Sequence, residues 1–454
     1  MNQKNSVRIE DTISAGAKIG YGVGDFGANL VFQSVLIFLI FYFTDVFGIA
    51  ASVAGTIFFV SKAWDAVTDP TMGYLSDRTH TRWGQKRPYL LFGAIPLGLC
   101  FFFLFASPNI NEGFRPIYAL IFFLLVCTFY TVVNIPYGAL TASMTVDAHE
   151  RSKISGVRTF FALMGTLTVA GATLPLVDLF GGGSVGFRAT GAIFGALAAI
   201  LTLVTFFSVR ERVVQRDTTH YSLRDILTVL KSNRPFIILS FGMIMHLTAL
   251  GVLAAMINYF FKYIMNDADF ATFAFLCIFV PAALALPLWV WVSKKMSKKA
   301  AFNAGMGLLA LSLLGIFFVR ELNPAVLLPM FIVGGIGLST NFFSPWAMVP
   351  DTVEYGQLQT GLRREGILYG VFFFGQKMAS ALAGFIAGQG LSFFGFVANE
   401  SQTNQTLLGI RILTTFVPIA LIILGILIIS FYPINQAMHT KILEDIEKSQ
   451  KNGL

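Results

Sequence analysis

Twelve apolar stretches dominate this chain, and each is long enough to cross a lipid bilayer as a helix. A helix needs about 20 apolar residues to span about 30 Å of hydrocarbon. Only 12% of the residues are charged, against about 25% in an average soluble domain. The sequence therefore predicts an all-α membrane protein with no sizeable soluble domain. The stretches lie at about 17–45, 49–76, 87–107, 115–144, 153–178, 187–209, 234–263, 268–293, 301–319, 322–350, 366–396 and 408–433.

Lysine and arginine are concentrated in alternate loops. If both termini are cytoplasmic, 24 of these residues lie in cytoplasmic segments and 5 in outer segments. This asymmetry follows the positive-inside rule and favours an even number of spans. Residues 1–16 are polar and have no signal-peptide core, so we expect the first span to direct insertion into a bacterial plasma (inner) membrane. The loops account for the net charge of +8, and we expect no nucleic-acid partner.

The chain also divides into two similar parts. The longest cytoplasmic connection carries Leu223, Ile226, Leu227 and Leu230 at helical spacing, which predicts a short surface helix. Met144-Thr-Val-Asp147 ends the fourth span and Met348-Val-Pro-Asp351 ends the tenth, although so short an echo can arise by chance. We expect two pseudo-symmetric six-helix bundles, the architecture of a transporter with a site near the midplane. The predicted segments are 1–16, bundle 17–209, linker 210–233, bundle 234–433 and cytoplasmic tail 434–454.

The second span contains two carboxylates where hydrocarbon should surround the chain. Asp65 and Asp69 are four residues apart and share one helix face. A charge at the bilayer centre costs about 2.5–3.5 kcal/mol, so intramembrane carboxylates indicate function. With Thr68 and with Thr131 of the fourth span, they could bind Na⁺ or Li⁺ as a metal site, or a proton. Alternatively, Asp69, which precedes Pro70, caps the helix near the cytoplasmic surface.

A polar stripe in the first span suits a hydroxyl-rich ligand. Asp25, Asn29 and Gln33 follow one another at intervals of four residues. Asn134 in the fourth span lies three residues after Thr131, so one helix could contact both cation and sugar, near a kink at Pro136. The alternative is that these groups form hydrogen bonds between helices, or that they are polar groups of an ordinary kinked helix.

Arg158 and Lys377 are basic residues within spans. A guanidinium offers paired donors to hydroxyls or to a carboxylate, whereas a lysine offers a point charge. Arg158 could instead extend to the cytoplasmic interface. Phe342 and Trp346, one turn apart in the tenth span, could stack on a sugar ring or simply pack in the core.

Other residue patterns argue against enzyme or ATP-driven chemistry. The three cysteines all fall in apolar spans, which predicts no disulfide framework. Gly181-Gly-Gly-Ser184 lacks the following lysine and hydroxyl residue of a phosphate-binding loop. No nucleophile–base pair is visible, so we expect no enzyme activity and no cofactor besides a coupling ion.

Several segments resemble the glycoside–pentoside–hexuronide:cation symporter family of the major facilitator superfamily, which includes the melibiose permeases. The resemblance covers nearly the whole chain, and the loop after the second span is its most specific part. The segments are Tyr21-Gly-Val-Gly-Asp25, Tyr42-Phe-Thr44-Asp45, Trp64-Asp65-Ala-Val-Thr-Asp69-Pro70, Ser76-Asp77-Arg78-Thr-His-Thr-Arg82-Trp83-Gly84-Gln-Lys86-Arg87-Pro88, Thr131-Val-Val-Asn134-Ile-Pro136, Arg158 and Asp351-Thr-Val-Glu354-Tyr355-Gly356.

This resemblance implies cation-coupled sugar uptake by alternating access. The cation carboxylates of the family correspond to Asp65 and Asp69, and its fourth-span threonine corresponds to Thr131. Thr68 replaces an asparagine of the melibiose permeases, which leaves Na⁺ and H⁺ both open as the coupling ion.

The resemblance also places the sugar-binding residues. Asn29 and Asn134 replace two sugar-binding aspartates, Arg158 and Lys377 are retained, and Phe342 replaces a tryptophan. The position two residues after Pro136 is aromatic in the family and is Gly138 here. The loss of two carboxylates would suit an acidic sugar such as a hexuronide. However, amides also bind neutral sugars such as xylosides, and Asp25 could restore the balance of charge.

Two other functions remain as alternatives. A lysolipid or other amphiphile symporter would need a largely apolar cavity, which the polar stripe from Asp25 to Gln33 disfavours. A non-transporting sugar sensor would need an output domain, and none is visible. We expect a monomer embedded in the bilayer, with a sugar and a cation as its small-molecule partners.

Overall fold

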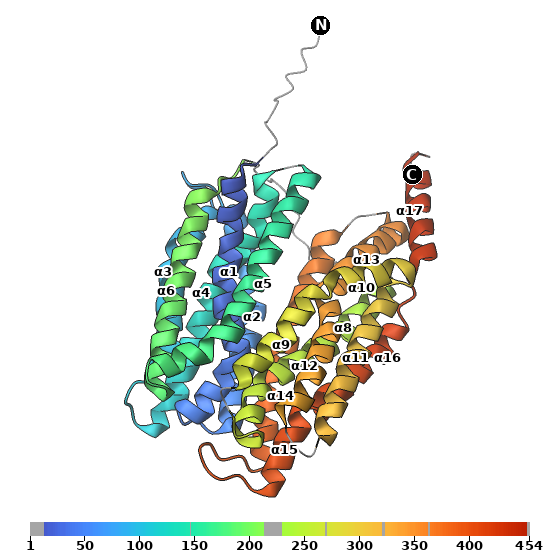
Figure 1. Ribbon diagram of the computed structural model, residues 1–454. Helices are drawn as coiled ribbons and strands as arrows, with labels where there is room; N and C mark the ends of the chain where they lie inside the picture. The colour runs from blue at the N-terminus through green and yellow to red at the C-terminus, as the bar shows by residue number, and fades with distance from the viewer. Residues whose placement is uncertain are drawn as a thin grey trace. The chain divides into compact units, whose positions relative to one another are not determined.

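The computed structural model describes residues 13–145, 147–212, 229–267, 270–319, 323–361 and 364–451. Within these ranges every regular element is helical (Figure 1), apart from one isolated bridge between Thr81 and Gly84. The predicted linker helix falls mostly on residues 213–228, which lie outside the described ranges.

The first half of the chain runs from α1 to α6. Two short elements interrupt the regular helices: η1 is a π-helical turn and η2 a 3₁₀ turn. The bounds are α1 Ala15–Phe41, η1 Tyr42–Val46, α2 Ala51–Arg78, α3 Arg87–Leu104, η2 Glu112–Phe114, α4 Arg115–Met144, α5 Ala148–Leu179 and α6 Gly183–Ser208.

The second half runs from α8 to α17. Its η3 is again a π-helical turn, and η4 is a 3₁₀ segment that interrupts the tenth predicted span. The bounds are α8 Arg234–Tyr259, η3 Phe260–Ile264, α9 Phe270–Leu284, α10 Leu286–Lys295, α11 Lys298–Phe318, α12 Pro324–Leu338, η4 Ser339–Phe342, α13 Ser344–Thr360, α14 Glu365–Phe393, α15 Asn404–Thr414, α16 Phe416–Ser430 and α17 Gln436–Lys451.

The described helices make this a multi-pass membrane protein. Ten are long and apolar enough to cross a bilayer, or eleven if α9 and α10, bent by 44°, form one span. α2 is not among them although it has 28 residues, because Lys62, Asp65 and Asp69 interrupt its apolar sequence. The predicted total of twelve therefore requires that α2 also crosses, and it stays a prediction.

Close contacts divide the chain into two compact units, residues 1–35 with 64–218 and residues 36–63 with 219–454. The boundaries fall inside α1 and α2. The end of α1, the turn η1 and the start of α2 therefore belong with the second half of the chain.

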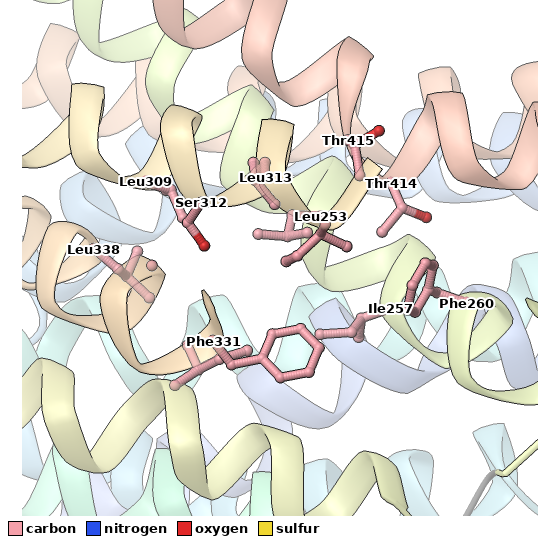
Figure 2. A pocket seen from close by; sticks show the side chains of 13 residues that line it. Leu253, Ile257, Phe260, Leu309, Ser312, Leu313, Phe331, Leu338, Thr414 and Thr415 are labelled. Carbon is pink, nitrogen blue, oxygen red and sulfur yellow. The ribbon is translucent and has the colours of Figure 1, made fainter. Parts of the chain in front are cut away.

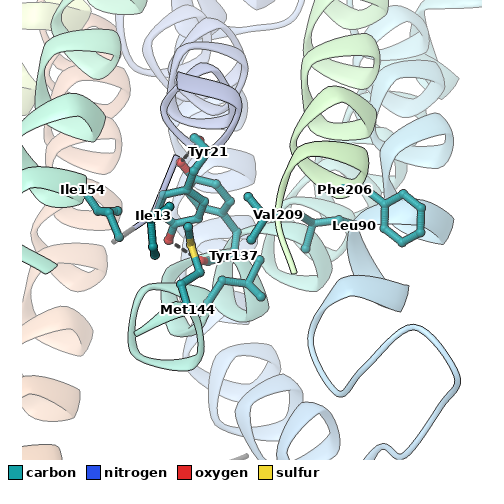
Figure 3. Close-up of a cluster of buried hydrophobic side chains, with 9 residues drawn as sticks. Ile13, Tyr21, Leu90, Tyr137, Met144, Ile154, Phe206 and Val209 are labelled. Atoms are coloured by element: carbon teal, nitrogen blue, oxygen red, sulfur yellow. Dashed lines mark hydrogen bonds between the residues drawn. The ribbon is translucent and has the colours of Figure 1, made fainter. Parts of the chain in front are cut away.

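In the first unit, a buried cluster holds α1, α3, α4, α5 and α6 together near the start of α1 (Figure 3). Tyr21 and Tyr137 stack at its centre, with ring centroids 4.6 Å apart. The hydroxyl of each donates to the backbone carbonyl of the other, at 2.7 Å in both cases. These reciprocal bonds satisfy two buried hydroxyls and fix α1 on α4.

Glu211, which follows α6, anchors the loop before α3. Its carboxylate accepts the backbone N–H groups of Gln85, Lys86 and Arg87 at 2.8–3.0 Å. A carboxylate at a helix N-terminus satisfies donors that have no partner within the helix. Gly84 permits this approach, because a Cβ there would lie 2.4 Å from the carboxylate and its φ is +109°.

In the second unit, α8 packs against both α14 and α16. Between α8, α9, α11, α12 and α15 lies an apolar cavity of about 40 Å³ (Figure 2), lined mainly by leucine, isoleucine and phenylalanine side chains such as Leu253, Leu309 and Phe331. Such a lining offers little to a polar ligand, and we regard the cavity as a packing defect.

Both halves end their first helix in the same irregular way. In η1, the N–H of Phe47 donates to Tyr42 at 2.8 Å, and in η3 that of Met265 donates to Phe260 at 3.1 Å. The residue after each donor has a positive φ: 75° at Gly48 and 53° at Asn266. The repetition is consistent with the predicted pseudo-symmetry.

Candidate functional site

Hydroxyl groups of α4 meet one face of α2. The Thr131 hydroxyl donates to an oxygen of Asp69 at 2.7 Å, and the Thr68 hydroxyl lies 3.5 Å from the Thr131 hydroxyl. One turn away, the Trp64 indole N–H donates to the Thr128 hydroxyl at 3.0 Å. The structure thus brings together three of the four predicted cation ligands and fixes the register of α2 on α4.

Asp65, the fourth predicted ligand, lies one turn before Asp69 and is 2% exposed. With Thr131, which is also buried, the group presents carboxylate and hydroxyl oxygens. Hard oxygen donors suit alkali cations, and a pair of carboxylates can also share a proton. The residues present therefore fit either Na⁺ or H⁺.

Asp25 and Arg158 form an ion pair between α1 and α5. Arg158 Nε lies 2.5 Å from Asp25 Oδ2, and Nη2 lies 3.3 Å from Oδ1. The guanidinium also lies over the rings of Tyr137 and Tyr21, at 4.9 and 5.5 Å from their centroids. Arg158 is therefore oriented by contacts with α1 and α4.

The remaining polar stripe of α1 has mixed contacts. Asn29 donates to the backbone carbonyl of Asp25 at 2.9 Å, which is a bond within the helix. Gln33 donates to the Thr166 hydroxyl of α5 at 3.3 Å, with Asn29 Oδ1 3.5 Å away. Gln33 thus forms a hydrogen bond between helices, which was the predicted alternative to sugar binding. Asn29 is half-buried beside the Asp25–Arg158 pair.

Asn134 is half-buried on α4, three residues after Thr131. α4 continues as one helix through the buried Pro136 to Met144. The same continuous helix therefore carries both a candidate cation ligand and a candidate sugar ligand.

The other three candidates belong to the second unit. Lys377 is half-buried on α14, one turn after Phe373. Trp346 of α13 is 40% exposed and packs against Phe373, with centroids 5.8 Å apart and the ring planes tilted by 50°. Phe342 ends the 3₁₀ segment η4 and is half-buried.

Other side chains stabilise the interruption of the tenth span. The Trp289 indole N–H donates to the Ile336 carbonyl at 2.7 Å. The Thr340 hydroxyl donates to the Gly337 carbonyl at 3.0 Å. Carbonyls near the interruption are thereby paired, as a bilayer requires, and interrupted helices are typical of transporter binding sites.

Sequence reasoning missed several residues that support this site. Tyr21 and Tyr137 support the Arg158 guanidinium, and Trp64 with Thr128 sets the register of α2. Tyr21 and Asp25 are four residues apart and share one helix face, and this spacing could have predicted that Tyr21 lies near the Asp25–Arg158 pair.

Asp351, Glu354 and His439 form a further cluster whose ligand atoms lie within 4.8 Å of one another. Such a set could hold a metal ion. However, Lys298 Nζ lies 2.7 and 2.9 Å from the two Asp351 oxygens, and His439 Nε2 lies 2.6 Å from Glu354. We therefore interpret the cluster as an ion network that holds α17 on α13.

The sequence profile of the MFS/sugar transport protein family, where MFS is the major facilitator superfamily, matches residues 20–436. The match includes every candidate residue for cation or sugar binding and extends over both halves of the chain.

Individual relatives match along nearly their whole length. An uncharacterized symporter, YnaJ, of Bacillus subtilis (strain 168) is 35% identical, with 97% of this chain and 96% of the relative covered. The isoprimeverose transporter of Lactiplantibacillus pentosus is 33% identical, with coverages of 100% and 96%. The glucuronide carrier protein homolog of Escherichia coli (strain K12) is 30% identical, with both coverages at 95%.

Proposed function

Because the chain belongs to the MFS/sugar transport protein family, and so to transporters rather than enzymes, we propose that it couples uptake of a glycoside to entry of Na⁺ or H⁺. It does so by alternating access in a bacterial plasma membrane, with both termini cytoplasmic. It works as a monomer and needs no cofactor beyond the coupling ion.

One observation carries the cation assignment. Thr131 of α4 donates to Asp69 of α2 at 2.7 Å, one turn from the buried Asp65. A charged side chain within a membrane span is energetically costly, so it usually serves a function. A relative of similar length is named a symporter, which supports coupling in this chain also.

The route of coupling runs along α4. A cation held by Asp65, Asp69, Thr68 and Thr131 fixes the position of α4 against α2. Asn134, one turn further along the same helix, then presents its amide to the sugar. Since coupling free energies are reciprocal, bound sugar tightens cation binding by the same factor.

The substrate we favour is a neutral glycoside that contains a pentose. Asp25 neutralises Arg158 within the first half of the chain, so the positive surplus inferred from Asn29 and Asn134 is smaller than expected. Relatives named for isoprimeverose and for glucuronide leave both charge classes open. Asn29, Gln33, Asn134, Arg158 and Lys377 supply the polar contacts, with Trp346 and Phe342 as aromatic surfaces.

Counterflow in proteoliposomes tests both parts of the proposal. Vesicles loaded with unlabelled sugar receive labelled xylosides, other neutral glycosides or glucuronides outside, with or without Na⁺ and at two pH values. We expect a neutral glycoside to exchange best, and one cation to increase its apparent affinity. Exchange that is indifferent to Na⁺ and to pH would contradict coupling.

A second candidate, a lysolipid symporter, can be tested in the same vesicles. The paired polar groups on α1 favour a hydroxyl-rich ligand over an acyl chain. Labelled lysophospholipid should therefore not exchange, and its exchange in place of every glycoside would replace our assignment.

A further inference from the structure

The two π-helical turns η1 and η3 contact each other through charged side chains. Asp45 Oδ1 of η1 lies 2.7 Å from Lys262 Nζ of η3, and 217 residues separate the two in sequence. The Tyr263 hydroxyl donates to the same oxygen at 2.5 Å. All three residues belong to the unit formed by residues 36–63 and 219–454. The pair therefore links the end of the first helix to the second half of the chain.

Neighbouring groups complete this network. The Thr44 hydroxyl donates to Asp45 Oδ2 at 2.7 Å and lies 2.6 Å from the Tyr259 hydroxyl. Asn399, in the loop between α14 and α15, accepts from Lys262 at 2.7 Å and donates to the Asp45 carbonyl at 2.8 Å. Each Asp45 oxygen thus has a donor.

Because Asp45 is buried, the network should be either fully formed or fully broken. The Asp45 side chain is 1% exposed and that of Lys262 is 30% exposed. A buried ion pair is stable when complete, and removal of one partner leaves a charge that burial strongly disfavours. Because Lys262 is already partly exposed, η1 and η3 can separate only if water also reaches the buried Asp45 carboxylate. Intermediate separations, with the pair broken but dry, are unfavourable.

The contact continues as a close crossing of α2 and α14 in the same unit. A Cβ on Gly388 would lie 2.5 Å from Gly55 Cα, so the two backbones touch. Beside them, Gln389 Nε2 donates to the Ser52 carbonyl at 3.0 Å and to the Thr56 hydroxyl at 3.2 Å. The first two helices of the chain are thus both fastened to the second half.

We propose that Asp45, Lys262, Tyr263 and Asn399 form an outer latch, which closes the transport pathway on the side away from the termini. With both termini cytoplasmic, the ends of α1 and α8 lie at the outer surface. In an alternating-access cycle the latch breaks when the protein opens outward to admit sugar, and it re-forms before release inside. The outer latch rests on the proposed transport function for its role, but its closure is measurable without transport.

Hydrogen–deuterium exchange of the purified full-length protein, without sugar or gradient, tests the outer latch. Asp45→Asn keeps the side-chain size and leaves the Lys262 charge without its partner. We expect amide exchange in peptides covering 42–49 and 260–267 to accelerate about tenfold, because loss of one partner of a buried pair shifts the closed state toward open states. Peptides from α3 should keep their wild-type rates, which shows that the variant is folded.

Two further variants make the test specific. The double variant Asp45→Asn with Lys262→Met removes both charges, and should return exchange to within about threefold of wild type, since no unpaired charge remains. Asp267→Asn is the matched control, because this exposed carboxylate on the same segment only caps α9 through Phe270 N–H. It should leave exchange unchanged.

Wild-type exchange in the Asp45→Asn variant would overturn the outer latch, as would a double variant that exchanges as fast as the Asp45→Asn variant. Neither result bears on the sugar or the coupling ion, which the counterflow assay decides. Conversely, failure of the glycoside assignment would leave the exchange result intact.

Discussion

Asp25 and Asp45 both lie in the first stretch of the chain, are both buried, with side chains 12% and 1% exposed, and both pair with a basic residue. Asp25 pairs with Arg158 of α5, inside the first compact unit. Asp45 pairs with Lys262, so it joins the first half of the chain to the second. Two buried ion pairs on the same stretch therefore need not have the same role. We infer that the first pair orients a sugar ligand and that the second controls access to it.

We expect the largest effect on sugar affinity from substitution of Asp25. Asp25→Asn should leave the Arg158 guanidinium without its carboxylate and lower the affinity for a neutral glycoside about 100-fold, as for loss of one partner of a buried pair. The apparent KM in counterflow measures this, and Asp25→Glu should recover part of the loss. Unchanged affinity in Asp25→Asn would show that the pair does not serve the sugar site.

Asp45→Asn should give the opposite kinetic pattern. We expect the maximal rate of gradient-driven uptake to fall about tenfold, because an outward-biased population slows the inward step. The apparent affinity for sugar added outside should not fall, and should rise slightly, because a larger fraction of the protein is then open to the outside. A large rise in KM at an unchanged maximal rate would place Asp45 in the sugar site instead and erase the contrast.

Tyr263→Phe is the mildest way to weaken the outer latch. It removes one hydrogen bond to Asp45 and keeps the ion pair with Lys262. Because Lys262 still holds the carboxylate, we expect the net loss to be about 0.5–1 kcal/mol, and the maximal uptake rate to fall about threefold. An effect larger than that of Asp45→Asn would mean that the tyrosine acts through another contact.

Several parts of this picture were predictable from sequence, since they depend on neighbours along one helix or on local composition. The helical membrane architecture followed from the apolar stretches. The pairing of α2 with Thr131 followed from the family resemblance, and the structure brings Asp69 to that hydroxyl. The possibility that Asp25 balances Arg158 followed from charge counting, and the ion pair confirms it.

The outer latch was not predictable in this way. Asp45 and Lys262 are 217 residues apart, and neither sequence segment reveals that its helix ends in a π-helical turn. The contact depends on how helices from the two halves pack, which no local pattern specifies. The same reason explains why Glu211 was missed, because its three backbone partners lie more than a hundred residues earlier.

The most direct test of cation-coupled transport is sugar accumulation by the Asp65→Asn variant in proteoliposomes with an imposed Na⁺ or proton gradient. Removal of this buried carboxylate charge should abolish accumulation above the outside concentration, while counterflow without a gradient keeps a measurable part of its wild-type rate. Accumulation equal to that of the wild type would contradict the account, because the carboxylates of α2 would then have no part in coupling.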